Sequence, residues 1–222
     1  MVSLNGNEIQ RVSVIDDDPT SRDGYSLFVE ELAMEALKEG GPFSSVTQCV
    51  GRVLASAQAA ISDFKLRVKN YATFNGAELV ASLYEKRVPA ILCTRFEWAD
   101  IDQIRPYRAR IPSLLRPDEL DAESLPLALE RCVQEFRSEF AQTRRPWKAL
   151  IRIEDVHSEP GQGTSIDVCV PSWSNNVMIR LRQSELPAWT HARLTQNERV
   201  YAEVNLGAER PEDLYFANWS ES

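Results

Sequence analysis

The chain has 222 residues, of which 43% are hydrophobic and 26% charged, a globular composition that excludes a fibre or a disordered chain. The net charge is −8, and residues 1–146 and 147–222 are each acidic, which argues against a basic nucleic-acid-binding domain. No apolar run approaches the roughly 18 residues of a membrane span, so the simplest interpretation is a soluble cytoplasmic protein. Four cysteines without a CxxC pair and only two histidines give no zinc or haem pattern.

Residues 1–145 alternate short β-rich runs with amphipathic segments. The runs predict strands at 11–15, 33–38, 59–61, 89–94 and 111–115. Helical spacing predicts helices at 20–32, 46–54, 76–83, 99–107 and 123–140, with Ser44 or Ser45 capping the second and Asn75 or Gly76 opening the third. Five strands in strict alternation with five helices predict an α/β domain with a doubly wound, five-stranded parallel sheet in the order 2-1-3-4-5.

The sequence changes character at Arg144-Arg145-Pro146. Residues 146–222 hold short β-rich runs at 149–156, 165–170, 177–181, 199–204 and 213–216, with a short helix near 185–194, which predicts a small β-barrel or sandwich. Gly207 is expected in a tight turn at positive φ. The aromatic residues of this part are interpreted first as core and edge packing, with a stacking platform for bases as the alternative. We expect no catalytic role for His157 or His191.

Acidic residues follow two strands that are neighbours in the predicted sheet. Asp16 and Asp17 end the first strand, and Asp63 ends the third. Their carboxylates should therefore lie within a few ångströms of one another and repel unless a cation intervenes. Magnesium is a hard ion that takes oxygen ligands, so the sequence predicts a Mg²⁺ site from which a phosphoryl group could reach Asp63.

The next two strands also end in residues suited to phosphate chemistry. Thr94 ends the fourth strand and can offer a hydroxyl to a phosphoryl oxygen. Arg116 follows the fifth strand, precedes Pro117 and can offer a positive charge. Together, these residues after consecutive strands are stronger evidence for a phosphate site than any one of them alone. A single acidic residue after a strand is often only a helix cap.

In these positions the sequence resembles the receiver domain of bacterial response regulators, over about residues 10–140. The matching segments are Val14-Ile15-Asp16-Asp17-Asp18-Pro19 with Arg22, Ala59-Ala60-Ile61-Ser62-Asp63, Asn75-Gly76-Ala77-Glu78-Leu79, Ile91-Leu92-Cys93-Thr94 and Leu114-Leu115-Arg116-Pro117. The resemblance implies that Asp16 and Asp17 bind magnesium, that Asp63 accepts a phosphoryl group from a partner histidine kinase, and that Thr94 senses it.

The sequence departs from the receiver pattern at several positions. Arg116 stands where receivers have lysine, and its planar guanidinium is not equivalent to a compact ammonium. Ser113 stands where the aromatic switch residue is usual, and Arg95 where a small residue follows the threonine. The segment from Asp63 to Gly76 is longer than usual and contains Lys65, Arg67 and Lys69.

The sequence therefore predicts a signalling protein rather than an enzyme, with a receiver at 1–145 joined to a small β domain at 146–222. Its expected partners are a histidine kinase or another signalling protein and a protein output partner, and a homodimer through the receiver is left open. Arg116 and Ser113 motivate a second hypothesis, an adaptor whose receiver fold has lost its chemistry. A third is an oligonucleotide-binding regulator that acts through the C-terminal barrel, which the acidic charge disfavours.

Overall fold

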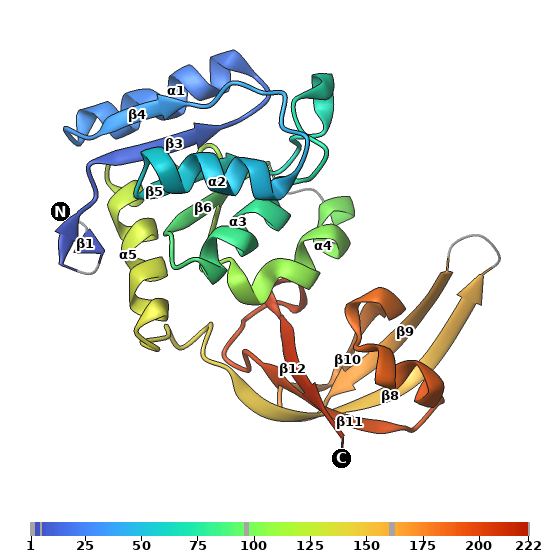
Figure 1. The fold of residues 1–222 in the computed structure, drawn as a ribbon. Helices are drawn as coiled ribbons and strands as arrows, with labels where there is room; N and C mark the ends of the chain where they lie inside the picture. The colour runs from blue at the N-terminus through green and yellow to red at the C-terminus, as the bar shows by residue number, and fades with distance from the viewer. Residues whose placement is uncertain (1–2, 5, 96–97, 160–162, 222) are drawn as a thin grey trace. The chain divides into compact units, whose positions relative to one another are not determined.

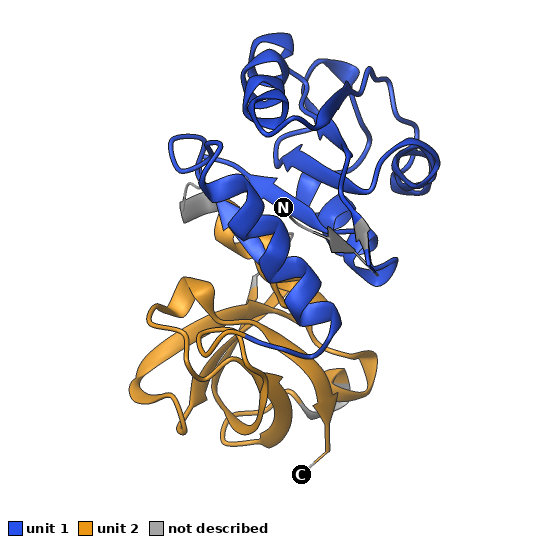
Figure 2. Ribbon diagram, turned by 90° about the vertical axis from the view of Figure 1, so that its left-hand side faces the viewer, with its two compact units in different colours: residues 1–97, 110–140 blue, residues 98–109, 141–222 orange. Residues whose placement is uncertain are grey.

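The computed structural model describes residues 3–4, 6–95, 98–159 and 163–221. The chain forms two compact units, residues 1–97 with 110–140 and residues 98–109 with 141–222 (Figure 2). Each unit has its own five-stranded sheet (Figure 1). Among the helices of the described residues, none has the length and apolar character needed to cross a bilayer.

The sheet of the N-terminal unit is parallel throughout, as predicted. Its strands are β3 (Arg11–Ile15), β4 (Glu35–Lys38), β5 (Ala59–Asp63), β6 (Ala90–Cys93) and β7 (Ser113–Leu115). They are ordered β4-β3-β5-β6-β7, which is the predicted 2-1-3-4-5 arrangement. A hairpin of β1 (Ser3–Leu4) and β2 (Asn7–Glu8) precedes them. The sequence did not predict this hairpin, because two-residue strands are too short to show a period.

Helices follow the strands, and their N-termini lie where the capping residues indicate. They are α1 (Pro19–Glu31), α2 (Val46–Ser56), α3 (Gly76–Glu85) and α5 (Ser124–Phe136). The side chain of Ser45 accepts a hydrogen bond from the Gln48 amide, and that of Asn75 accepts one from the Glu78 amide, so these residues cap α2 and α3. Helix α5 ends at Phe136 rather than at 140, because Ser138 adopts a φ of 65° that no helix continues.

The helices cover the parallel sheet on both faces. Tyr25 and Val29 of α1 and Leu125 and Leu129 of α5 join one core cluster with buried side chains of β3, β5 and β6. Helices α2 and α3 pack against each other and against these strands, as Figure 1 shows. Burial on both faces explains why the strands read as nearly continuous apolar runs rather than as alternating ones.

The long connection between β5 and α3 is anchored to the N-terminal unit. It includes the 3₁₀ turn η1 (Val68–Asn70), and five of its side chains are buried: Phe64, Leu66, Tyr71, Ala72 and Phe74. Its backbone is also tied to residue 43, since the Phe43 amide donates to the Tyr71 carbonyl oxygen at 2.8 Å. These buried side chains hold the connection, and with it Lys65, Arg67 and Lys69, near the end of β5.

The sheet of the C-terminal unit is antiparallel and confirms the β-rich prediction. Its strands are β8 (Trp147–Glu159), β9 (Gly163–Val170), β10 (Ser174–Arg182), β11 (Arg199–Val204) and β12 (Phe216–Ser220), in the order β10-β9-β8-β11-β12. Among the described residues, the strand pairs leave β10 and β12 at the edges, so closure into a barrel stays a prediction. Helix α4 (Trp98–Ile104) and most of the 3₁₀ segment η2 (Arg105–Arg110) belong to this unit.

Three local predictions for the C-terminal unit are wrong. The segment near 185–194 forms the 3₁₀ turns η3 (Gln183–Glu185) and η4 (Ala188–Arg193) instead of an α-helix. Residues 211–213 form the 3₁₀ turn η5 (Pro211–Asp213), and the last strand begins three residues later. Gly207 is not among the residues with positive φ. It is needed for space, because a Cβ there would overlap the Gln142 carbonyl oxygen.

The aromatic residues of this unit lie partly in its core. The indole nitrogen of Trp173 donates to the Ala208 carbonyl oxygen at 2.7 Å, and the Tyr215 hydroxyl donates to the Arg144 carbonyl oxygen at 2.6 Å. Trp219 stacks on Phe216 with ring centroids 5.7 Å apart. Trp147 is an exception, with 47% of its surface exposed. Packing accounts for the first four of these rings.

Candidate metal centre

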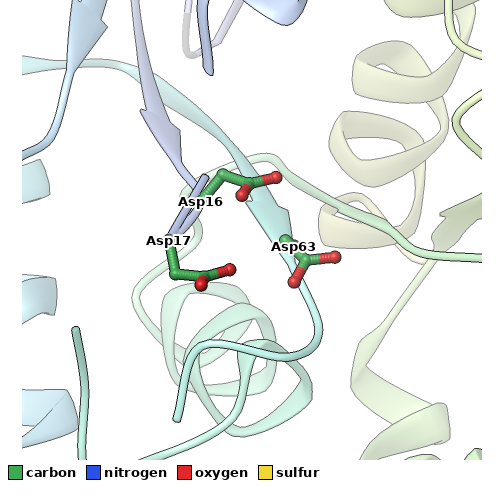
Figure 3. Close-up of side chains that lie close together, drawn as sticks. All are labelled: Asp16, Asp17 and Asp63. Carbon is green, nitrogen blue, oxygen red and sulfur yellow. The ribbon is translucent and has the colours of Figure 1, made fainter. Parts of the chain in front are cut away.

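Three carboxylates meet at the carboxyl edge of the parallel sheet. Asp16 and Asp17 directly follow β3, and Asp63 is the last residue of β5. The two strands pair in parallel with Ile15 opposite Ser62, so their ends lie level. Ligand oxygens of the three side chains all lie within 4.8 Å of one another, and Figure 3 shows the carboxylates grouped on one side of the strand ends.

Burial makes this cluster electrostatically costly. Asp16 is only 4% exposed, and its burial raises its pKa to about 7, with the charges of Asp63 and Asp17 acting in the same direction. The Asp18 amide opposes this shift by donating to Asp16 Oδ1 at 2.7 Å. The pKa of Asp63 is also raised, chiefly by burial, although the Lys65 amide donates to its Oδ2 at 2.7 Å.

A magnesium ion fits these residues. Two oxygens bound to one Mg²⁺ can be at most about 4.2 Å apart, because each bond is 2.0–2.1 Å long. The observed separations need only a small contraction or a bridging water to meet that limit. A bound divalent cation would also lower the pKa values of these carboxyl groups, because it favours their ionised form.

Thr94 shares a cavity with the acidic cluster. This cavity has a volume of about 380 Å³ and is lined by all three aspartates, Thr94 and Lys65, among others. Thr94 follows β6 and is 3% exposed, and its amide donates to the Leu115 carbonyl oxygen at 2.9 Å. Arg95 also lines the cavity but is itself exposed. The cavity thus combines carboxylates, hydroxyl groups and basic residues.

The structure does not bring Arg116 to this cavity. Its Nη2 lies 3.1 Å from Asp118 Oδ2, its side chain is 61% exposed, and its neighbour Pro117 lines the cavity instead. Its backbone amide donates to Glu119 Oε2 at 2.8 Å. The guanidinium is therefore engaged by a carboxylate of its own loop.

Lys69 supplies a positive charge that the sequence interpretation did not assign to the site. Its Nζ lies 3.7 Å from Asp17 Oδ2. Lys69 and Asn70 both adopt left-handed backbone conformations, with φ of 52° and 57°, which turn the connection sharply at this point. The length and basic character of the segment were visible in the sequence, but the turn that directs Lys69 to Asp17 was not.

Ser113 occupies the position where the resemblance leads one to expect an aromatic switch. It is 1% exposed, and its hydroxyl donates to the Ala128 carbonyl oxygen of α5 at 2.7 Å. The hydroxyl satisfies its hydrogen bonding inside the core, so Ser113 links β7 to α5.

A parallel sheet in the order 2-1-3-4-5, covered by helices on both faces and bearing acidic residues after its first and third strands, is the doubly wound arrangement of the chemotaxis-type receiver. The N-terminal unit has a receiver fold. In this fold, Asp63 lies at the end of the central strand, with Asp16 and Asp17 after the neighbouring one.

Solved structures similar to this chain include a response regulator receiver domain protein, a putative response regulator and a sensor protein. A response regulator receiver domain protein from Clostridium thermocellum is 19% identical and matches 58% of this chain and 97% of its own, with a TM-score of 0.44. A putative response regulator from Chloroflexus aurantiacus is 14% identical over 57% and 98%, with a TM-score of 0.44. A sensor protein from Polaromonas is 17% identical over 56% and 96%, with a TM-score of 0.41. No family model and no curated protein sequence matches the chain.

Proposed function

We propose that the protein is a two-component-type signalling protein whose receiver binds Mg²⁺ through Asp16, Asp17 and Asp63 and accepts a phosphoryl group on Asp63. The observation that carries this proposal is the convergence of the three carboxylates with Thr94 around one cavity at the carboxyl edge of the sheet. Burial makes the ionised forms of Asp16 and Asp63 costly, and cation binding is the simplest role that offsets this cost.

The chain's own residues would act as follows. A carboxylate oxygen of Asp63 attacks the phosphorus of a partner's phosphohistidine, the P–N bond breaks, and the departing imidazole nitrogen keeps the electron pair and is protonated. The metal supplies positive charge to the phosphoryl oxygens and to the carboxylates that hold it. The Thr94 hydroxyl is available to a phosphoryl oxygen, since Thr94 lines the same cavity.

Lys69 takes over the counter-charge role that Arg116 was expected to fill. Its ammonium stands beside Asp17, while the guanidinium of Arg116 is held by Asp118. An ammonium is compact and can rotate its three donors toward a phosphoryl oxygen. The buried anchors of the β5–α3 connection keep Lys69 near the cluster.

Incubation with acetyl phosphate and Mg²⁺ followed by intact-mass measurement tests the proposal. The wild type should gain the mass of one phosphoryl group, and Asp63→Asn should gain none. Asp23→Asn is a matched control, because Asp23 is an exposed carboxylate of α1 that pairs with Lys38. Absence of the adduct on the wild type, under conditions that modify a control receiver, would reject the proposal.

The second candidate is an adaptor that keeps the receiver fold without its chemistry. Two observations favour it: Arg116 is turned to Asp118, and Ser113 is fixed to α5 by its hydrogen bond. An adaptor requires that Asp63→Asn leave the affinity for a captured protein partner unchanged. A signalling receiver requires that acetyl phosphate alter that affinity in the wild type and not in Asp63→Asn.

A further inference from the structure

Both histidines of the chain line one cavity of the C-terminal unit. The cavity has a volume of about 760 Å³. Its wall includes His157 of β8, Arg180 and Arg182 of β10, His191 of η4 and Asp102 of α4. Apart from Gly163, every described residue that lines it has a polar side chain, and Asp102 contributes the lining's single carboxylate. Such a wall favours a polar ligand rich in hydrogen-bond acceptors over an apolar one.

Arg180 and His157 are held in place by a carboxylate that does not line the cavity. Asp167 accepts hydrogen bonds from Arg180 Nε at 2.8 Å and Nη2 at 2.9 Å, and its Oδ2 lies 2.8 Å from His157 Nε2. These partners, Arg180 first, hold the pKa of Asp167 at about 2. A guanidinium fixed on one side by a bidentate carboxylate loses little further entropy when it meets a ligand.

A buried arginine supports the same wall. Arg105 is 8% exposed, and its Nη1 donates to the Arg180 carbonyl oxygen at 2.7 Å. Its Nε has no hydrogen-bond acceptor among the described residues. Burial lowers the pKa of Arg105 and raises that of Glu185, and the opposite charges of the two side chains partly offset each other. Arg105 therefore supports the backbone of β10 at Arg180, next to the cavity wall.

We propose that this cavity binds the phosphate group of a small phosphate monoester such as a sugar phosphate. The planar guanidinium groups of Arg180 and Arg182 match the geometry of phosphate oxygens. Thr164, Ser165, Ser184 and Gln183 offer hydroxyl and amide groups to a polyhydroxylated remainder. The volume lies in the range of small-molecule sites.

Both imidazoles lie beside charged or polar groups of the cavity wall. His157 Nε2 lies between opposite charges: Asp155 Oδ2 is 3.8 Å away and Arg180 Nη2 is 3.3 Å away. His191 Nε2 faces the carbonyl oxygens of Gln183 and Leu186 at 3.0 and 3.2 Å. Asp102 lies 3.6 Å from Arg182 and partly offsets its charge.

Proton NMR of the full chain offers a direct readout, because its two histidines are the sole source of imidazole C–H signals. A His157→Asn variant assigns them. At fixed pH and ionic strength, inorganic phosphate and glucose 6-phosphate should shift both signals saturably, the ester at lower concentration, and glucose should not. Arg182→Gln should weaken ester binding about tenfold, the value of one lost charge-assisted hydrogen bond.

Arg199→Gln is the matched control, because it removes an equal charge from an exposed position of β11 that does not line the cavity. It should leave the affinity within about twofold. The proposal is overturned if neither phosphate probe shifts the signals, if glucose binds as well as its ester, if inorganic phosphate binds as tightly as the ester, or if Arg182→Gln binds like the wild type. Since Asp63 takes no part in this cavity, these outcomes do not depend on phosphorylation.

Discussion

Asp16 is a nearly fully buried carboxyl group whose pKa is raised by burial to about 7, whereas its pKa in an unfolded chain is near 3.9. Below about pH 4 the Asp16 carboxyl group is protonated in both the folded and the unfolded state, so its burial does not change the free energy of unfolding through ionisation. Between pH 4 and pH 7 the unfolded state ionises first, and above pH 7 the cost to the folded state is complete. Asp16 therefore destabilises the metal-free protein at neutral and alkaline pH.

Asp16→Asn should accordingly stabilise the metal-free protein by about 1–3 kcal/mol at pH 8 and hardly at all at pH 4. The amide oxygen of asparagine can keep the hydrogen bond from the Asp18 amide. Urea unfolding at the two pH values measures the difference, with Asp23→Asn as the exposed control. The same variant should lose the stabilisation that Mg²⁺ gives the wild type. An equal gain at both pH values would contradict the raised pKa.

If Mg²⁺ binds as proposed, Lys69 competes with it for Asp17. Its ammonium lies 3.7 Å from Asp17 Oδ2, but its side chain is 62% exposed, so solvent screens the interaction. Lys69→Met should therefore tighten Mg²⁺ binding by only about two- to fivefold, measured by calorimetric titration. Lys38→Met serves as control, because Lys38 pairs with Asp23 instead of a cluster carboxylate. Weaker Mg²⁺ binding in Lys69→Met would show that the loop lysine supports the metal rather than opposing it.

At the level of the elements, Gly76 fixes the distance between β5 and α3. It is the first residue of α3, its amide donates to the Phe64 carbonyl oxygen at 2.9 Å, and a Cβ on it would overlap the Asp63 carbonyl oxygen. Gly76→Ala must therefore push α3 away from the end of β5. We expect a loss of roughly 2–4 kcal/mol of unfolding free energy and weaker Mg²⁺ binding, because Asp63 moves as well.

Gly51 provides the opposite case in the neighbouring helix. It lies inside α2, is exposed, and has nothing within 4 Å of its Cβ position. Gly51→Ala should stabilise the protein by about 0.5–1 kcal/mol, since alanine is the better helix former. Chemical unfolding of both variants in parallel separates the packing effect from the propensity effect. Similar behaviour of the two variants would disprove the close approach at Gly76.

The sheet could be predicted from the sequence because its signals are local and repeated. Most of the parallel strands are short, largely apolar runs, although the edge strand β4 (Glu35–Lys38) is not. Ser45 and Asn75 mark the starts of α2 and α3 with capping side chains. The convergence of Asp16 and Asp63 follows from strand order alone. Lys69 and Arg116 could not be placed, because a turn at positive φ and a local ion pair with Asp118 decide where each charge lies. The close approach at Gly207 depends on Gln142, which is distant in the sequence.

At the scale of the whole molecule, residues 98–109 lie within the sequence of the N-terminal unit yet belong to the C-terminal one. Arg105 donates to the Arg180 carbonyl oxygen, and Arg144 donates to the carbonyl oxygens of Arg108 and Ala109 at 3.2 Å. Arg108 in turn lies 3.8 Å from Asp213. Without this segment, the Arg180 carbonyl oxygen and the buried Arg144 guanidinium lose these partners, at about 1–3 kcal/mol for each group left unsatisfied.

The fragment 146–222, cut at the boundary that the sequence suggests, should therefore be unfolded or far less stable than the same residues in the full chain, because such losses are comparable to the whole stability of a small domain. Circular dichroism and urea unfolding of the fragment measure this. A synthetic peptide of residues 98–109, added in excess, should restore β structure by binding the folded form, and a peptide with Arg105→Gln should restore less. A fragment that unfolds cooperatively at the midpoint found for β8–β12 in the full chain would show that residues 146–222 are a self-sufficient domain and that the inserted segment only decorates it.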